Sequence, residues 1–281
     1  MERWSADLVL DAHADLGEGP VWDARSSELL WVDIMAGLVH RFDPASGTDV
    51  ALDVGRPVGC VVTRASGGWA LGLQDGFATA NGSVELIAPL DLGRPDLRIN
   101  DGAVDSRGRF WAGTMQLDSE PEAGRLYRLD ADGSLHTMLT KVTISNGIGW
   151  SPDDTAMYYT DTATRRIDLF DWEAEGGTIA NRRPFVALEE GAGGPDGLVV
   201  DEEGGVWLAL WEGFAVHRYS PEGELLGVVD VPVGRVTKAA FGGPRLDELY
   251  ITTARGPEPH AGGLFCARPG VRGLPAHDFA G

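Results

Sequence analysis

The chain has 281 residues, of which 43% are hydrophobic and 23% charged, which is the composition of a soluble globular protein with a substantial core. Its formal net charge of −20 argues against a nucleic acid partner, because a phosphate backbone needs a basic face, and equally against docking on an anionic membrane. No apolar run approaches the roughly 20 residues of a membrane helix.

The first residues, MERWSADLVLDAHADLGEGP, lack the long apolar stretch of a signal peptide, and acids interrupt them early. We therefore expect a cytoplasmic protein. The two cysteines, Cys60 and Cys266, lie far apart and form no zinc-binding spacing. In a cytoplasmic protein they should be reduced and buried.

Strand-like runs with an aromatic residue near the centre recur along the chain: ELLWVDI, GGWALGL, GRFWAGT, AMYYTDT, GVWLALW and ELYITTA. The aromatic residues stand at positions 31, 69, 111, 158, 207 and 250, which are 38 to 49 residues apart. A polar turn precedes each run and an apolar segment precedes each turn, which indicates a β-hairpin. Further hairpins follow in several repeats, as in VHRFDPASG and LYRLDADG. The repeating unit is therefore about four short strands.

Four-stranded units at this period, without convincing helical periodicity, are typical of β-propeller blades. We predict an all-β fold: one domain, residues 1–281, forming a six-bladed β-propeller of four-stranded antiparallel blades. Strands from the two ends of the chain should close the ring, with ADLVLDA at 6–12 beside GGLFCAR at 262–268. A β-sandwich or an open array of hairpins is the alternative, although neither has a reason to repeat at this period.

Polar residues next to glycines precede four of the aromatic positions by 11 to 13 residues: Glu18, Asn100, Asn146 and Asp196. Lys238 and Gly59 hold the corresponding positions in the other two repeats. Because the innermost strands of a propeller line a central channel, we expect the four polar side chains to point into one pocket. Their neighbouring glycines should allow sharp backbone conformations near the axis: Gly19, Gly102, Gly147 and Gly197.

Two carboxylates and two amides form an oxygen-rich cluster, and converging carboxylates are costly unless a cation compensates them. Hard oxygen ligands suit calcium, magnesium or manganese, with iron(II) and zinc as alternatives. Taken singly, each of these residues is also typical of an ordinary turn. The coincidence of four at repeat spacing favours a binding site.

Five motifs in this order span nearly the whole chain: LGEGPVWD, RINDGAVDSRGRFWAGTM, ISNGIGWSPD, GPDGLVVDEEGGVW and FGGPRLDELYITTA. They resemble the gluconolactonase, regucalcin (senescence marker protein) and luciferin-regenerating enzyme family. The resemblance implies a six-bladed propeller with one axial divalent metal, calcium in the first place, and hydrolysis of sugar lactones.

By the same resemblance, the metal ligands are Glu18, Asn146 and Asp196. Asn100 matches a residue that binds the substrate or a water on the metal, and Arg98 matches an arginine that contacts substrate hydroxyls. The family often has a glutamate shortly after AGTM, where this chain has Asp118. This shorter acid is expected to shift the sugar preference.

A sugar lactone is an internal ester, so its hydrolysis needs a polarised carbonyl, an activated water and a stabilised oxyanion, which one Lewis-acidic metal can support. The expected catalytic residues are Asp196, as the acceptor of a proton from water, and Asn100, which would orient the water or the lactone. Arg98 and Asp118 would hydrogen-bond the sugar hydroxyls. Residues 116–122 would form a rim over the pocket or a passive loop, and Trp211 would stack on a sugar or pack within its blade.

The sequence holds no HExxH, GxSxG or GxxxxGK[ST] motif. Two other functions stay open: a metal-dependent esterase or lactonase for non-sugar substrates, and a propeller that binds a cation or a partner without catalysis. The expected partner is a small-molecule sugar lactone, with no nucleic acid and no membrane. The sequence does not define the sugar, the ring size, the physiological metal or the oligomeric state.

Overall fold

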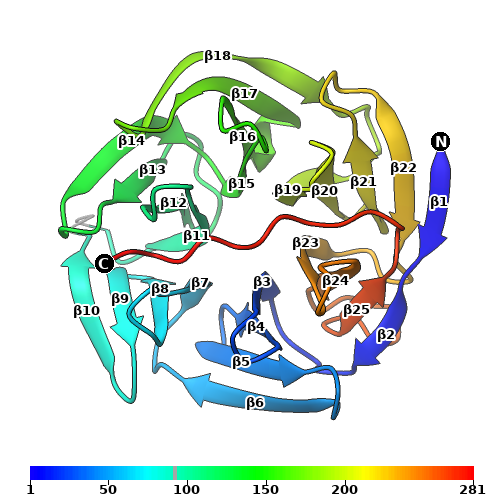
Figure 1. Ribbon diagram of the computed structural model, residues 1–281, viewed down its shortest axis with the longest axis horizontal. Coiled ribbons are helices and arrows are strands. Elements are labelled where there is room, and N and C mark those ends of the chain that lie inside the picture. The colour runs from blue at the N-terminus through cyan, green and yellow to red at the C-terminus, as the bar shows by residue number, and fades with distance from the viewer. Residues whose placement is uncertain (91–93) are drawn as a thin grey trace.

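The computed structural model describes residues 1–90 and 94–281, and Figure 1 shows six β-sheets arranged as blades around a central axis. From the inner to the outer strand, the first blade is β3 (Gly17–Asp23), β4 (Glu28–Asp33), β5 (Leu38–Asp43) and β6 (Thr48–Asp53). The second blade is β7 (Val58–Thr63), β8 (Trp69–Leu73), β9 (Gly76–Ala80) and β10 (Val84–Pro89). The third blade is β11 (Leu97–Val104), β12 (Phe110–Gln116), β13 (Gly124–Leu129) and β14 (Leu135–Val142).

The next two blades are β15 (Ser145–Trp150), β16 (Ala156–Asp161), β17 (Arg166–Glu173) and β18 (Thr178–Ala187); and β19 (Gly194–Val200), β20 (Val206–Trp211), β21 (Ala215–Tyr219) and β22 (Leu225–Asp230). The sixth blade is β23 (Val236–Gly242), β24 (Glu248–Thr253), β25 (Leu264–Ala267) and β2 (Asp7–Leu10). Within the described residues, the helical structure is one 3-10 turn at Thr162–Thr164. The predicted all-β, six-bladed propeller is confirmed.

The ring is closed by strands from both ends of the chain, as predicted. β2 pairs antiparallel with β25, with Asp7 opposite Cys266 and Leu8 opposite Phe265. The first strand was not predicted: β1 (Glu2–Ser5) pairs parallel with β22 as a fifth strand of the fifth blade. The N-terminal segment therefore joins the fifth blade to the sixth, and Figure 1 shows it along the rim of the ring beside β22 and β25.

All six recurring aromatic residues lie on the second strand of their blades, which confirms the repeat. The turn before that strand and the aromatic residue form one unit in two blades. Asp105 accepts a hydrogen bond from Trp111 Nε1 at 2.8 Å, and Asp201 accepts one from Trp207 Nε1 at 2.8 Å. Since both carboxylates are fully buried, these bonds satisfy polar groups that burial would otherwise leave unpaired.

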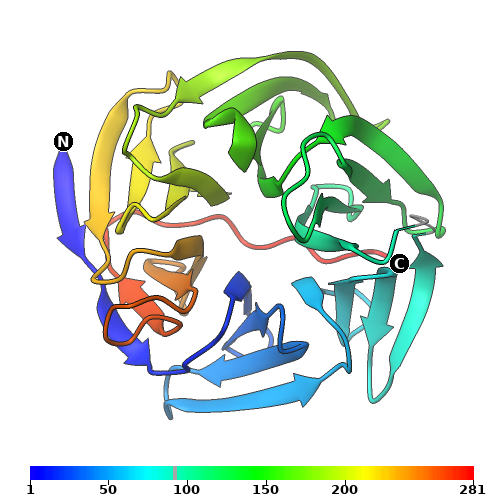
Figure 2. The same ribbon diagram turned by 180° about the vertical axis from the view of Figure 1, so that it is seen from behind.

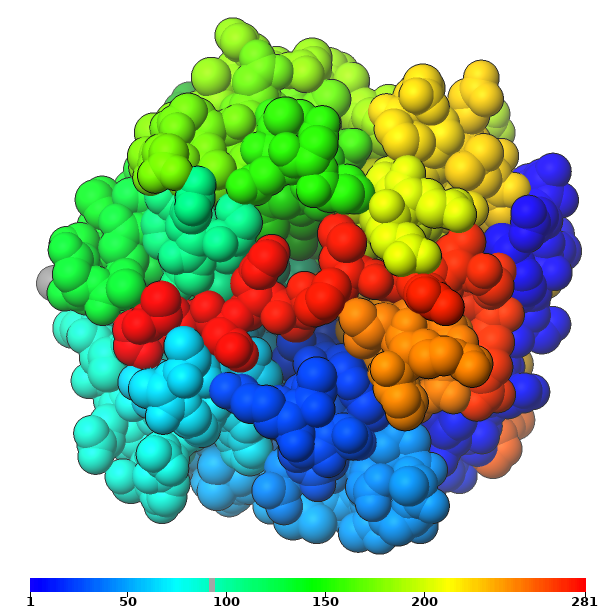
Figure 3. Space-filling view, viewed as in Figure 1, coloured from blue at the N-terminus to red at the C-terminus, as the bar shows by residue number. Residues whose placement is uncertain are grey.

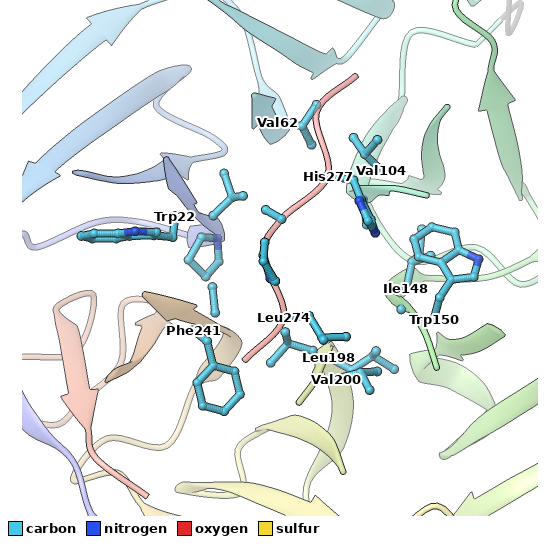
Figure 4. Close-up of a pocket in the computed structure, with 18 of the residues that line it drawn as sticks. Trp22, Val62, Val104, Ile148, Trp150, Leu198, Val200, Phe241, Leu274 and His277 are labelled. Carbon is cyan, nitrogen blue, oxygen red and sulfur yellow. The ribbon is translucent and has the colours of Figure 1, made fainter. Parts of the chain in front are cut away.

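The C-terminal segment, residues 268–281, crosses one face of the ring and covers the end of the channel there (Figures 1 and 3); Figure 2 shows the same crossing behind the blades. Its far end is anchored by Phe279, which is 1% exposed and whose backbone N donates to Thr63 O at 2.8 Å. Between this segment and the inner strands lies a cavity of about 380 Å³. Figure 4 shows that its lining is mainly apolar, with Trp22, Ile148 and Phe241 among the side chains around the segment.

Both cysteines are free and buried, as predicted. Burial raises the pKa of the Cys266 thiol to about 12 and that of the Cys60 thiol further still. No helix among the described residues has the length and apolar character needed to cross a membrane.

Candidate functional site

Every inner strand carries a β-bulge at or beside the residue that the sequence repeat places near the axis. The pairing register shifts between these residues: Glu18 and Val21, Val58 and Cys60, Ile99 and Asp101, Ser145 and Ile148, Pro195 and Leu198, and Val236 and Lys238. A bulge breaks the strict alternation of side chains along a strand and re-aims the residues beside it. Successive residues of one strand can therefore both face the axis.

The glycines beside the polar residues serve two different purposes. Gly19 has a positive φ of 55°, and its backbone N donates to Glu18 Oε2 at 2.8 Å, so the sharp conformation expected there is present. Gly102, Gly147 and Gly197 do not have positive φ, so they are not required for a left-handed backbone conformation. They leave room instead: a Cβ atom on Gly147 would stand 2.7 Å from the backbone N of Leu198.

The four predicted polar residues lie buried on their inner strands, with exposures of 3% for Glu18, 5% for Asn100, 3% for Asn146 and 5% for Asp196. Asn100 Nδ2 donates to Asn146 Oδ1 at 3.0 Å and to Ser145 O at 2.8 Å. Asn146 Nδ2 in turn donates to Thr162 Oγ1 at 2.8 Å. The two amides thus form a continuous hydrogen-bonded chain from the third blade to Thr162, between β16 and β17 of the fourth blade.

Both carboxylates of the cluster have raised pKa values, because burial and neighbouring negative charge disfavour their ionised forms. Burial, followed by the charge of Asp101, raises the pKa of Glu18 to about 8. Burial and then the charges of Glu18 and Asp101 raise the pKa of Asp196 well above its usual value. The negative charge of neighbouring acids therefore raises the pKa of both Glu18 and Asp196, as expected for like charges that lie close together.

Arg98 brings a buried cation to the same pocket. Its Nη1 donates to Asn100 Oδ1 at 2.6 Å and to Ile99 O at 3.2 Å, while its buried Nε has no hydrogen-bond partner among the described residues. Burial lowers the pKa of the guanidinium to about 10, and the charges of Glu18 and Asp196 oppose that shift. An unpartnered donor in a buried pocket is a group that a polar ligand would satisfy.

Two further residues belong to the axis and had no predicted role. Lys238 is 6% exposed and its Nζ donates to Oδ1 of Asp101, which is fully buried. The sequence contains a signal for Lys238, because it occupies the repeat position of the site residues. Asp101 stands directly after Asn100, and only the bulge between Ile99 and Asp101 explains how both can face inward.

Asp118 lies outside this cluster. It is exposed on the turn after β12, where its backbone N donates to Gln116 Oε1 at 2.6 Å. Among the described contacts, its carboxylate joins none of the hydrogen bonds of the buried pocket. The loop 116–122 is attached to the turn before β11, because Arg94 forms an ion pair with Glu120 at 2.6 Å.

Trp211 ends β20 and is partly exposed. The guanidinium carbon of Arg235 lies 5.3 Å from the centre of its ring, close enough for a cation–π interaction.

The donor set fits a hard divalent cation. In the part of the chain that the structure describes, no group of three or more His, Cys, Asp or Glu side chains is placed to hold a metal ion. The predicted ligands are instead two carboxylates, Glu18 and Asp196, with the amide oxygen of Asn146. These groups are buried oxygens of the kind that such cations prefer, and a bound cation would stabilise the ionised forms that burial and mutual repulsion disfavour.

The structure is a six-bladed β-propeller with a cluster of buried, oxygen-rich side chains on its axis. The chain belongs to the SMP-30/Gluconolactonase/LRE-like family, whose model matches residues 16–255. It is 39% identical to regucalcin of Gallus gallus over 95% of each chain, and 39% identical to pentonolactonase XacC of Haloferax volcanii over 88% of this chain and 84% of that protein.

Among solved structures, a calcium-binding protein, regucalcin from Agrobacterium tumefaciens, superposes with a TM-score of 0.94 at 27% identity. That match covers 99% of this chain and 98% of the other.

Proposed function

We propose that the protein hydrolyses a sugar lactone to the aldonic acid, with one divalent cation, calcium in the first place, held by Glu18, Asn146 and Asp196. The observation that carries the proposal is the buried cluster of these oxygens near the Arg98 guanidinium, whose Nε donor has no hydrogen-bond partner among the described residues. The similarity to a pentonolactonase supports the substrate class.

The chemistry divides between the cation and the side chains. A bound divalent cation would polarise the lactone carbonyl and stabilise the oxyanion. Asp196 accepts a proton from the attacking water as the water oxygen bonds to the carbonyl carbon. The bond between that carbon and the ring oxygen then breaks, and the proton passes to the ring oxygen, which becomes a hydroxyl group of the acid.

Arg98 holds the substrate, and Asn100 holds Arg98 in place. The Arg98 guanidinium donates to lactone or hydroxyl oxygens, and its bond to Asn100 fixes its direction. Both ends of the Asn100 amide already have protein partners, so Asn100 contributes mainly by orienting Arg98 and Asn146. Asp118, on the loop after β12, is the proposed contact for a more distant hydroxyl of the sugar.

The test is acid release from defined lactones. The protein is stripped of metal with a chelator and offered glucono-, galactono-, xylono- and arabinonolactones in a pH-indicator assay. Calcium, magnesium, manganese, iron(II) and zinc are then added back singly. The proposal expects one of these metals to restore the hydrolysis of one or two of the lactones well above spontaneous ring opening.

Two other outcomes would replace the proposal. Hydrolysis of simple aryl esters but of no sugar lactone would indicate a non-sugar substrate. Calcium binding by calorimetry without hydrolysis of any ester would indicate a cation-binding propeller, and the similarity to a calcium-binding protein named regucalcin gives that outcome its support.

A further inference from the structure

One side chain crosses the central channel. The inner strands follow one another around the ring in the order β3, β7, β11, β15, β19, β23, so β11 and β23 lie on opposite sides of the axis (Figure 1). Lys238, on β23, nevertheless donates through Nζ to Asp101 Oδ1 on β11 and approaches Gly102 O at 3.4 Å. The lysine therefore spans the channel from wall to wall.

The path of the side chain is fixed by its surroundings. A Cβ atom added to Gly197 would stand 2.4 Å from Lys238 Cγ and 2.8 Å from Cδ, so the stem lies directly against the backbone of β19. The side chain is almost fully buried, and its far end has a specific partner. These contacts hold Lys238 in one position.

Lys238 lies between the proposed metal ligands and the cavity beneath the C-terminal segment. The proposed metal ligands come early in their inner strands: Glu18, Asn146 and Asp196. The residues that follow them line the cavity beneath the C-terminal segment, and Lys238 itself belongs to that lining together with Gly102. The ion pair therefore forms the floor of the metal pocket.

The charge of Lys238 matters as much as its position. Asp101 Oδ2 is buried without a hydrogen-bond partner, while Oδ1 accepts from Lys238 and from the backbone N of Gly102 at 2.7 Å. Burial lowers the pKa of Lys238, but the charge of Asp101, its hydrogen bond to the lysine and the charge of Glu18 together outweigh burial and raise the pKa above its usual value. The lysine is therefore a permanent cation beside three buried acids: Glu18, Asp101 and Asp196.

We propose that Lys238 is a fixed counter-cation that sets the metal affinity of the axial pocket. It cancels the charge of Asp101 and closes the channel below, so that a metal ion binds to two free carboxylates rather than three. This inference rests on the metal site of the proposed function. It predicts that substitutions of Lys238 and of Asp101 change the metal affinity in opposite directions, because Asp101 attracts a divalent cation and Lys238 repels it.

The experiment is a calorimetric titration of the chelator-stripped full chain with calcium chloride, supported by melting temperatures with and without calcium. Lys238→Met should bind calcium more tightly than wild type by about tenfold, and Asp101→Asn more weakly by about tenfold. The double variant should return to within about threefold of wild type, because it removes the two opposite charges together. Without metal, both single variants should melt below wild type, since each leaves a buried charge unpaired.

Lys141→Met is the matched control. It removes the same charge from a lysine whose side chain is 75% exposed, so screening by solvent should leave its calcium affinity near that of wild type. If Lys238→Met does not fold, Lys238→Gln tests the same charge while keeping a donor for Asp101, and it too should tighten calcium binding.

The failures are distinguishable. Wild-type protein that takes up no calcium or other divalent cation would overturn the metal site itself, and this inference with it. Wild-type binding that Lys238→Met changes no more than Lys141→Met does would overturn the role of Lys238 alone. A double variant no closer to wild type than the single variants would likewise contradict charge compensation.

Discussion

The amide of Asn100 joins the two halves of the site. Its Nδ2 donates to Asn146 Oδ1 at 3.0 Å, and its Oδ1 accepts from Arg98 Nη1 at 2.6 Å. One side chain thus connects a proposed metal ligand to the proposed substrate cation. Because donor and acceptor ends have different partners, no other residue type of this size can make the same pair of bonds.

Replacing Asn100 should therefore affect both metal binding through Asn146 and substrate binding through Arg98. Asn100→Ala leaves Asn146 Oδ1 without its donor and leaves the Arg98 guanidinium with only the longer bond to Ile99 O, so we expect the free energy of unfolding to fall by about 1–3 kcal/mol. Lactone kcat/KM should fall by about tenfold or more, because Arg98 and Asn146 lose their fixed directions. Urea unfolding and steady-state kinetics measure the two effects. The exposed Asn81→Ala serves as control, and equal behaviour of the two variants would exclude the role given to Asn100.

Asp196 should show a trade-off between stability and activity. Asp196→Asn keeps the shape but removes one of two mutually repelling buried acids, so the chelated variant should melt no lower than chelated wild type. Its kcat at saturating calcium should nevertheless fall by on the order of 10²–10⁴, the usual contribution of a proton acceptor.

Asp132→Asn is the matched control for this substitution. Asp132 Oδ1 accepts a hydrogen bond from Ser134 N in an exposed turn, and an asparagine there keeps that acceptor, so both measured quantities should stay at wild-type values. An Asp196→Asn enzyme with full activity would show that the proton goes elsewhere.

The sequence could predict the ring and the position of the pocket because both repeat. Aromatic residues from Trp31 to Tyr250 recur once per blade, and a corresponding position on the inner strand, polar in five of the six blades, recurs with them. Lys238 also occupies the repeat position, but the repeat period predicts only where a residue lies along its inner strand. It does not show how far a long side chain reaches, and Lys238 finds its partner on the opposite side of the ring.

Other features could not be predicted because tertiary contacts alone determine them. The bulge that turns Asp101 inward has no sequence signature that distinguishes it from a regular strand. The exposed position of Asp118 depends on hydrogen bonds of its backbone N and that of Glu120 to Gln116 Oε1. The C-terminal segment shows neither strand nor helix periodicity, and its course depends on Phe279 entering a core next to Phe110.

The close contact between β19 and the lysine stem makes Gly197 sensitive to any added atom. Gly197→Ala would place a Cβ 2.4 Å from Lys238 Cγ, and the stem cannot move freely because its Nζ is tied to Asp101. We expect a loss of about 1–3 kcal/mol in the free energy of unfolding. Gly176→Ala is the control, since a Cβ there meets only the flexible end of Glu173. Equal stability of the two variants would mean that Lys238 does not follow this path.

The C-terminal segment should contribute to stability without contributing to catalysis. Phe279 is 1% exposed and packs against Phe110 with ring centres 6.0 Å apart, so Phe279→Ala should cost about 3–5 kcal/mol of unfolding free energy. Leu274, which is 36% exposed over the cavity, should cost less than about 1 kcal/mol when changed to Ala.

Lactone kcat at 25 °C and saturating calcium should be unchanged in both variants, because the segment lies at the opposite end of the channel from Glu18 and Asp196 and the Lys238–Asp101 pair stands between them. Denaturant unfolding and kinetics on the same preparations make the comparison. A fall in kcat for Phe279→Ala under conditions where the variant is fully folded would mean that the two ends of the channel are coupled through that floor.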